Sequence, residues 1–248
     1  MRGAGGPAGR SEVPLAGQPG SGWIRRVSAY TGHVDPRGEA ATRTLPAVTI
    51  TKMSVGPMDN NTYLLVCRTT GDALLIDAAA DADRIADLLG AGADRPRLRS
   101  IVTTHRHQDH WQALGAIAGQ TGANLYAGAE DAGELPVPTD VPLEQGDTVP
   151  LGDSSLEVVK LRGHTPGSVA LLYRDPGGDP HLFTGDSLFP GGPGRTTSPA
   201  DFGSLMDDLE SRVFDVLPDT TWVYPGHGDD TTVGRERPHL TEWRARGW

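Results

Sequence analysis

The segment His105-Arg106-His107-Gln108-Asp109-His110 constrains the fold of this chain more than any other part of the sequence. It follows the apolar pair Ile101-Val102 and two threonines, and residues 111–117 have the pattern of a helix. The segment therefore lies in a turn between a strand and a helix. Neutral imidazole and carboxylate are the ligands that borderline divalent ions accept. The pattern thus predicts one half of a two-metal site.

Three later turns can supply the other half. Each places a histidine or an aspartate beside glycine in a turn next to a predicted strand. These residues are His164 in Gly163-His164-Thr165-Pro166-Gly167-Ser168, Asp186 in Thr184-Gly185-Asp186-Ser187, and His227 in Pro225-Gly226-His227-Gly228. The three histidines outside the motifs, His33, His181 and His239, have no ligand-like spacing, and we expect them to be surface or capping residues.

The charge of the chain argues against a nucleic-acid partner. Acidic residues outnumber basic ones by 32 to 22, and a net charge of −10 repels phosphate backbones. No stretch approaches the length of a membrane span, and the N-terminus lacks the apolar segment of a secretory signal. The single cysteine, Cys67, excludes an intrachain disulfide and is expected to be a small buried hydrophobe. We therefore expect a cytoplasmic protein without nucleic-acid or membrane partners; the oligomeric state is left open.

Composition divides the chain into two parts. Residues 1–44 are rich in Gly, Pro, Ala, Ser and Arg and follow neither a helical nor a strand period, so we expect a disordered extension. Residues 45–248 form the predicted folded domain. It opens with three antiparallel strands, at 48–53, 62–67 and 73–77.

The rest of the domain alternates strands and helices. A helix at 81–89, capped by Asp81 and stopped by Gly90, precedes a buried strand at 98–103. The second half repeats this plan, with strands near 155–161, 169–173 and 181–183, a helix at about 199–216 and a last strand at 222–224. In the later helix Ser198 can serve as N-cap, and one face carries Phe202, Leu205, Leu209, Val213 and Val216. Two sheets packed face to face, with helices outside, would bring the ligand loops to one edge.

Four motifs together resemble those of a known family. They are Thr104-His105-x-His107-x-Asp109-His110, Gly163-His164-Thr165-Pro166-Gly167, Thr184-Gly185-Asp186-Ser187-Leu188-Phe189 and Pro225-Gly226-His227-Gly228. Over roughly residues 46–240 the chain resembles the metallo-β-lactamase superfamily and, within it, the hydroxyacylglutathione hydrolase (glyoxalase II-like) branch. The resemblance implies an α/β fold, the metallo-β-lactamase αββα sandwich, in which two mixed β-sheets carry helices on both outer faces.

The resemblance also implies two divalent metal ions, with Zn as the first expectation and Fe or Mn accepted by the same ligands. The first ion would be bound by His105, His107 and His164, the second by Asp109, His110 and His227, with Asp186 as the bridge. A water held between two such ions has a pKa pulled toward 7, and the resulting hydroxide would attack a small-molecule thioester or ester. Asp109, which would orient the nucleophile, and Asp186 are the expected catalytic residues.

Two residues are predicted to bind substrate. Arg195, in Gly194-Arg195-Thr196-Thr197, corresponds to a loop that lies near the substrate in similar proteins and could grip a carboxylate; a solvated arginine is the alternative. Asn61, with Asn60 and Tyr63, resembles the family's segment near the pocket, although a plain β-turn explains the asparagines equally well. Full glyoxalase II enzymes have a helical C-terminal domain that contacts glutathione, whereas 21 residues follow His227 here. Glutathione as the thiol half is therefore in doubt.

Other functions compete with hydrolysis. Persulfide dioxygenases have similar motifs and would imply one Fe(II) at His105, His164 and Asp186, but their Gly-Arg-Thr-Asp loop ends in Thr197 here. A lactonase or a non-catalytic metal-binding scaffold is the second alternative, and a scaffold has no need of all seven ligands. A β-lactamase of the common two-zinc type would have cysteine in place of Asp186, which disfavours that activity.

Overall fold

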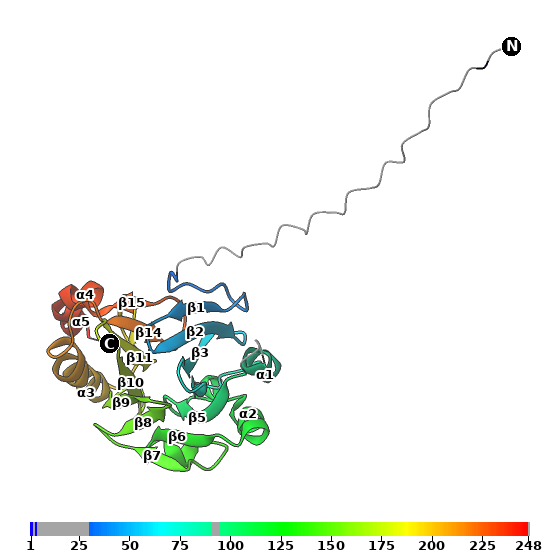
Figure 1. Cartoon of the computed structure of the whole chain (residues 1–248). Helices are drawn as coiled ribbons and strands as arrows, with labels where there is room; N and C mark the ends of the chain where they lie inside the picture. The colour runs from blue at the N-terminus through cyan, green and yellow to red at the C-terminus, as the bar shows by residue number, and fades with distance from the viewer. Residues whose placement is uncertain (2, 4–29, 91–94, 248) are drawn as a thin grey trace.

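Two β-sheets pack face to face at the centre of the molecule, and helices cover their outer faces (Figure 1). The computed structural model describes residues 1, 3, 30–90 and 95–247. The first sheet is covered by α1 (Ala82–Gly90) and α2 (Leu114–Thr121), and the second by α3 (Pro199–Leu209), α4 (Val233–Glu236) and α5 (Leu240–Arg246). The predicted αββα sandwich with two mixed sheets is confirmed.

The first sheet contains seven strands in chain order. They are β1 (Ala41–Thr44), β2 (Val48–Val55), β3 (Asn60–Cys67), β4 (Asp72–Ile76), β5 (Arg97–Thr103), β6 (Asn124–Gly128) and β7 (Val141–Leu143). Strands β1 to β4 pair antiparallel, and β4 to β7 pair parallel. Because β4 and β5 are parallel, Asp77 and His105, which lie just beyond them, are found at the same edge.

The second sheet contains six strands in the order β15-β14-β11-β10-β9-β8. Their bounds are β8 (Thr148–Leu151), β9 (Ser154–Lys160), β10 (Val169–Arg174), β11 (Pro180–Gly185), β14 (Trp222–Pro225) and β15 (Thr231–Thr232). Because β11 and β14 are parallel, Asp186 and His227 follow them at one edge. Strand β10 runs antiparallel to β11, so His164 before β10 reaches the same edge.

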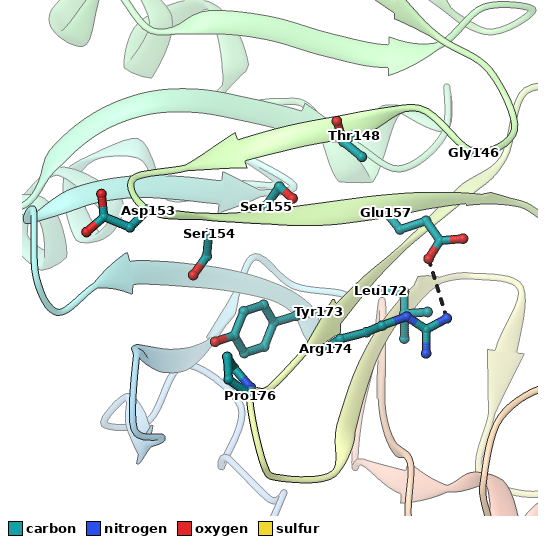
Figure 2. Close-up of a pocket in the computed structure, with 10 residues that line it drawn as sticks. All are labelled: Gly146, Thr148, Asp153, Ser154, Ser155, Glu157, Leu172, Tyr173, Arg174 and Pro176. Atoms are coloured by element: carbon teal, nitrogen blue, oxygen red, sulfur yellow. Dashed lines mark hydrogen bonds and ion pairs between the residues drawn. The ribbon is translucent and has the colours of Figure 1, made fainter.

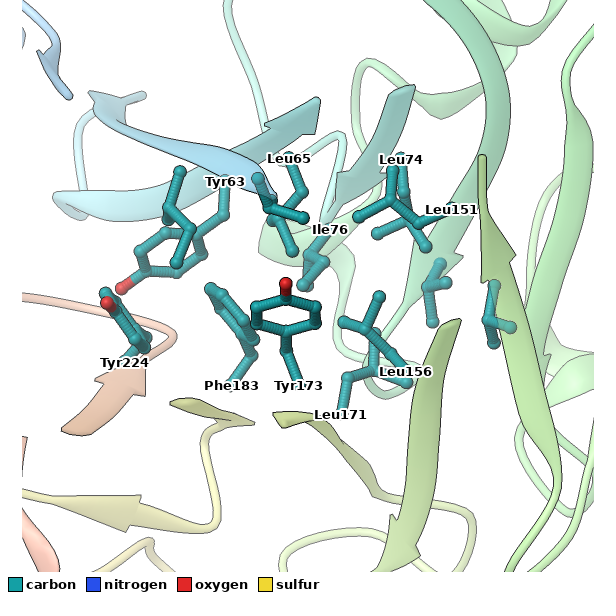
Figure 3. Close-up of a cluster of buried hydrophobic side chains, with 14 of the residues drawn as sticks. Tyr63, Leu65, Leu74, Ile76, Leu151, Leu156, Leu171, Tyr173, Phe183 and Tyr224 are labelled. Carbon is teal, nitrogen blue, oxygen red and sulfur yellow. The ribbon is translucent and has the colours of Figure 1, made fainter. Parts of the chain in front are cut away.

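The two sheets share one apolar core (Figure 3). Leu74 and Ile76 of the first sheet are at most 1 % exposed. Phe183 of the second sheet stacks on Tyr224, with ring centroids 4.5 Å apart, and Tyr63 of the first meets Phe183 edge-on at 5.3 Å. Such aromatic pairs add ~0.5–1.5 kcal/mol beyond the burial of their area. This core fixes the two sheets relative to each other, and hence the loops at their common edge.

The folded domain begins earlier in the chain than predicted. Strand β1 lies inside the predicted extension of residues 1–44 and pairs with β2 from Ala41↔Lys52 to Thr44↔Thr49. An edge strand pairs with a neighbour on one side alone, so its apolar pattern in the sequence is weak. In β1 a charged residue makes the contact with the second sheet instead, because the Arg43 guanidinium lies 4.3 Å from the centre of the Trp222 ring. Most of the predicted extension, residues 2 and 4–29, lies outside the described residues.

The predicted helix at 199–216 changes pitch before its end. Ser198 Oγ accepts a hydrogen bond from Asp201 N at 3.1 Å, as expected of an N-cap. After α3, however, a π-helical turn, η3 (Glu210–Phe214), inserts an extra residue into the period. Phe214 is consequently buried and Val216 is 61 % exposed. The prediction that Val216 shares the buried face is wrong.

Short elements complete the chain. They are the 3₁₀ turns η1 (Gln108–His110), η2 (Ala132–Glu134) and η4 (Arg237–His239), and a ribbon of β12 (Leu188–Phe189) with β13 (Gly192–Pro193). Cys67 is buried, as predicted. His181, expected at the surface, is instead 1 % exposed in the core. Within the described ranges, no helix has the length and apolarity that crossing a membrane requires.

Candidate metal centre

Three imidazoles meet at the common edge of the two sheets. His105 and His107 lie between β5 and α2, and His164 lies between β9 and β10. Their facing nitrogens, His105 Nε2, His107 Nδ1 and His164 Nε2, are 2.9–3.2 Å apart. Ligands around one cation at about 2.1 Å have such separations. These three residues can therefore share a metal ion.

A second group of donors lies beside the first. His110 Nε2 and His227 Nε2 are 3.2 Å apart, and Asp109 Oδ2 lies 3.5 Å and 3.3 Å from them, respectively. His110 is fully buried, whereas the side chains of Asp109 and His227 are 19 % and 22 % exposed. The second group can thus hold an ion that remains accessible from solvent.

Asp186 lies between the two groups. Its Oδ1 is 3.4 Å from His110 Nε2, and its Oδ2 is 3.4 Å from His227 Nε2 and 3.7 Å from His164 Nε2. Oδ1 is buried and has no hydrogen-bond partner in the described part of the chain. A buried carboxylate oxygen left in this way is costly unless a cation completes its surroundings. The structure brings all seven predicted ligand residues together.

Backbone and carboxylate oxygens orient three of the imidazoles. In each of these rings Nδ1 points away from the centre, toward a carbonyl or carboxylate oxygen that can only accept. Nδ1 therefore donates the hydrogen bond, and Nε2 is left as the metal-ligand atom. The acceptors are Asp77 Oδ2 for His110 (2.9 Å), Arg195 O for His164 (2.6 Å) and Met58 O for His227 (2.9 Å). This donor set fits divalent cations.

The electrostatics of the centre also favour positive charge. Burial opposes protonation of His110, but the carboxylates of Asp77 and Asp186 outweigh it and raise its pKa to about 10. Burial likewise opposes charge on His227, and Asp109 and Asp186 raise its pKa to about 10. The hydrogen bond from His227 holds the pKa of Asp109 well below its usual range. A divalent ion would satisfy the same carboxylates and displace protons from the ligand nitrogens.

Asp77 is a supporting residue that no motif in the sequence marks. Its buried carboxylate accepts hydrogen bonds from Thr104 N at 2.7 Å, Thr104 Oγ1 at 2.8 Å and His110 Nδ1 at 2.9 Å. Thr104 Oγ1 in turn lies 3.1 Å from His105 Nδ1. One carboxylate at the end of β4 thus orients both ends of the His105–His110 segment. Its signal in the sequence is slight, an aspartate directly after a buried strand.

Asp131 is a second support that the sequence did not indicate. It is fully buried, and its carboxylate accepts from Arg106 N at 3.0 Å, from Gly167 N at 3.0 Å and from the Thr165 hydroxyl. Arg106 lies between two ligands of the first motif, and Thr165 and Gly167 follow His164. Asp131 therefore ties the two loops of the first ligand group together.

Asn61 lies beneath the His227 loop and does not face a substrate. It is 1 % exposed, and its amide donates to Pro225 O and Gly228 O, both at 2.9 Å. Tyr63 OH also donates to Pro225 O, at 2.7 Å. We therefore reassign Asn61 from substrate binding to positioning of this loop. Its neighbour Asn60 donates to Asp109 Oδ2 at 2.9 Å and thereby holds a predicted catalytic carboxylate.

Two glycines are required by close approach to Asp186. A Cβ on Gly226 would lie 2.1 Å from Asp186 Oδ1 and 2.7 Å from His110 Cε1. A Cβ on Gly194 would lie 1.6 Å from Asp186 O. The loop after β13 therefore packs directly on the centre, and Arg195 O reaches His164 from it. Arg195 itself is exposed, and its backbone lies beside this ligand.

A cavity of about 460 Å³ lies apart from the centre (Figure 2). It is lined by residues of β8, β9 and the end of β10, including Tyr173 and Arg174. Because β10 starts beside the His164 loop and ends at this cavity, the cavity lies at the end of β10 that is remote from the centre. None of the seven predicted ligands is among the described residues that line it.

Comparison with protein families agrees with this architecture. The family described as the metallo-beta-lactamase superfamily matches residues 55–227, a range that contains every predicted ligand. The chain belongs to the metallo-beta-lactamase superfamily. The recognition made from the four motifs is thus confirmed.

Several relatives in this superfamily are hydroxyacylglutathione hydrolases. That of Fuscovulum blasticum is 36% identical over 171 residues, which cover 68% of this chain and 62% of the relative. That of Thermosynechococcus vestitus is 37% identical over 172 residues, covering 68% and 64%. The chain thus spans less than two thirds of the length of these relatives. An uncharacterized protein of Aquifex aeolicus is 33% identical over 201 residues, which cover 74% of this chain and 91% of the relative.

Solved structures of the superfamily have the same fold. ETHE1 from Myxococcus xanthus superposes with a TM-score of 0.69 at 29% identity, covering 79% of this chain and 84% of its own. TTHA1623 in a di-iron-bound form superposes with a TM-score of 0.63 at 31% identity, covering 75% and 96%.

Proposed function

We propose that this protein is a metal-dependent hydrolase of small thioesters or esters with a dinuclear centre, similar to glyoxalase II. The observation that carries the proposal is Asp186, whose two carboxylate oxygens lie between two complete groups of ligands. A single ion could not use all seven side chains. The hydroxyacylglutathione hydrolases among its relatives and the di-iron form of TTHA1623 support the proposal.

The seven ligand residues would hold two divalent ions, Zn as the first expectation and Fe or Mn as alternatives. When bound, these ions would supply a Lewis acid for the carbonyl and a hydroxide near neutral pH. The chain holds and orients the reacting groups. Asn60 fixes the carboxylate of Asp109 at 2.9 Å, so that its partly exposed face can orient the nucleophile. The fully buried His110, together with the Asp186 side chain, which is 13 % exposed, limits the access of water to the inner side of the centre.

Metal analysis combined with activity assays tests the proposal. Protein purified without chelator should contain about two divalent ions per chain and hydrolyse members of a panel of small thioesters, esters and lactones. Asp186→Asn should lose at least one ion, whereas Asp215→Asn, the same change at an exposed site, should lose none. Two ions in the Asp186→Asn protein with unchanged turnover would contradict the bridging role. Two ions in the wild-type protein without any hydrolysis would contradict the enzyme and indicate a non-catalytic metal-binding scaffold.

Arg195 is the residue that we expect to recognise the substrate. It is exposed, and its own backbone carbonyl orients His164, so position 195 lies next to the first ligand group. Arg195→Ala should raise KM for anionic thioesters severalfold and leave kcat and metal content nearly unchanged, because it removes binding rather than chemistry. Neutral thioesters provide the control. An equal loss of kcat for anionic and neutral substrates would contradict this role.

A persulfide dioxygenase is the second candidate, and the similarity to ETHE1 fits this alternative without outweighing the hydrolase. It would need one Fe(II) at His105, His164 and Asp186. Oxygen consumption with glutathione persulfide, together with one iron per chain, would identify this activity and exclude the dinuclear hydrolase.

A further inference from the structure

Lys52 and Asp230 form an ion pair in the interior of the domain. Lys52 lies in β2, Asp230 closes the loop that carries His227, and both side chains are 0 % exposed. We propose that this pair is a brace that positions the second ligand group through the His227 loop. The inference rests on the two-metal centre proposed above.

Every donor of the Lys52 ammonium is occupied. Its Nζ lies 2.7 Å from Asp230 Oδ1, 2.6 Å from Gly228 O and 2.8 Å from Gly32 O. A buried ammonium that loses an acceptor is costly, so these three oxygens are fixed relative to one another. Gly228 directly follows His227. The backbone of this ligand is thus held from the interior of the first sheet.

Asp230 extends the brace to the N-terminal segment. Its Oδ2 accepts from Tyr30 OH at 2.7 Å and from Trp222 Nε1 at 2.8 Å, and its backbone N donates to Gly32 O at 3.1 Å. A Cβ on Gly32 would lie 2.8 Å from Asp230 Cβ, so the segment packs directly on the loop. Residues 30–32 therefore belong to the support of the metal centre.

The brace reaches one ligand group and not the other. In the described ranges, no hydrogen bond of Lys52 or Asp230 goes to the loops of His105, His107 or His164. Those loops are tied by Asp131 instead. Loss of the brace should therefore weaken the second metal position selectively. A role in overall stability alone would affect both positions equally.

Cobalt titration of the metal-free protein tests this selectivity. Co²⁺ is followed by visible absorption and calorimetry in wild type, Lys52→Met, Asp230→Asn and Lys160→Met. Lys160 is the matched control, because it is also a largely buried lysine with two carboxylate partners, Glu130 and Glu144. Wild type and control should show two binding steps. In both brace variants the second step should weaken by roughly 10–100-fold, the cost usual for a supporting residue, with the first within about twofold.

A milder perturbation covers the case in which Lys52→Met does not fold. A chain that begins at Tyr30 keeps the Gly32 carbonyl and the Tyr30 hydroxyl, whereas a chain that begins at Asp35 lacks both. The shorter chain should show the same selective weakening, with faster hydrogen exchange at residues 226–230 in the metal-free state.

The outcomes separate two kinds of failure. Two unchanged cobalt steps in the brace variants, or equal weakening of both steps, would overturn the brace. A wild-type protein without two steps would overturn the dinuclear centre, and with it the proposed function.

Discussion

The single carboxylate of Asp77 orients two predicted ligands, His110 directly and His105 through Thr104. Its oxygens accept three hydrogen bonds, from Thr104 N, Thr104 Oγ1 and His110 Nδ1. Asp77→Asn turns one of these oxygens into a donor that faces other donors. We expect metal affinity to fall about 10–100-fold with the fold retained, as measured by competition with a chromophoric chelator. Asp72→Asn at the start of β4, the strand that Asp77 follows, changes a partly exposed partner of Arg97 and should leave the affinity unchanged.

His181 makes stability depend on pH at a distance from the metal centre. It is buried, with Nδ1 2.9 Å from Tyr224 OH, and burial lowers its pKa from 6.5 to about 4, with the nearby Arg43 adding to the effect and Asp179 opposing it. The unfolded chain therefore binds a proton between pH 6.5 and 4 that the folded chain excludes. Stability falls as the pH falls through this window, by roughly 3 kcal/mol in total.

His181→Gln should remove this dependence, because the amide does not titrate. Urea unfolding of metal-free protein at pH 7.5 and pH 4.5 measures the difference, which should be smaller in the variant by about 2–3 kcal/mol. His239→Gln, at an exposed position, serves as control. Equal differences in wild type and His181→Gln would show that His181 is not held neutral.

Among the structural elements, the loops at the strand ends leave no room around Asp186. Gly226→Ala would place a Cβ 2.1 Å from Asp186 Oδ1, so the loop or the carboxylate must move. We expect loss of at least one metal ion with the secondary structure retained, measured by elemental analysis and circular dichroism. Gly119→Ala in α2 has nothing within 4 Å of the new Cβ and should be neutral or stabilise by about 0.5–1 kcal/mol. Full metal content in Gly226→Ala would contradict this.

The same elements show what could be predicted from the sequence. The ligands could be found because each lies in a short motif of chemically unusual residues. Asp77 and Asp131 could not be found in this way, because their partners lie 25 to 36 residues away and are set by the pairing of strands. Asn61 was correctly predicted to lie near the centre, but its side chain was wrongly predicted to face the substrate. The alternation of side chains along β3 does not show that the His227 loop covers this one. The prediction that Val216 is on the buried helix face was wrong because a π-helical turn changes the helical period before this residue.

At the scale of the whole molecule, the centre joins the two sheets. His105, His107, Asp109 and His110 follow β5 of the first sheet, whereas the remaining ligands precede or follow strands of the second. Bound ions would therefore link both halves and stabilise the folded chain. Removal of the metal by chelator should lower the Tm by about 5–10 °C if free metal was near 100 times Kd. Added Zn²⁺ should restore it.

Asp186→Asn tests whether this stabilisation comes from the centre. In that variant the chelator should change the Tm much less, because fewer ions are bound at the start. A full Tm shift in Asp186→Asn would place the stabilising ion elsewhere in the molecule.

The bond from His164 Nδ1 to the carbonyl of Arg195 has an evolutionary consequence. Every amino acid supplies a backbone carbonyl, so exchange of the side chain at 195 leaves the acceptor of His164 in place. If residue 195 contacts the substrate as proposed, descendants of this chain could acquire new substrates by exchange at this position while His164 keeps its orientation. Gly194 has no such freedom, because a side chain there would meet Asp186 O at 1.6 Å. Two neighbouring positions thus differ in their tolerance: the side chain at 195 can be exchanged, whereas residue 194 must remain glycine.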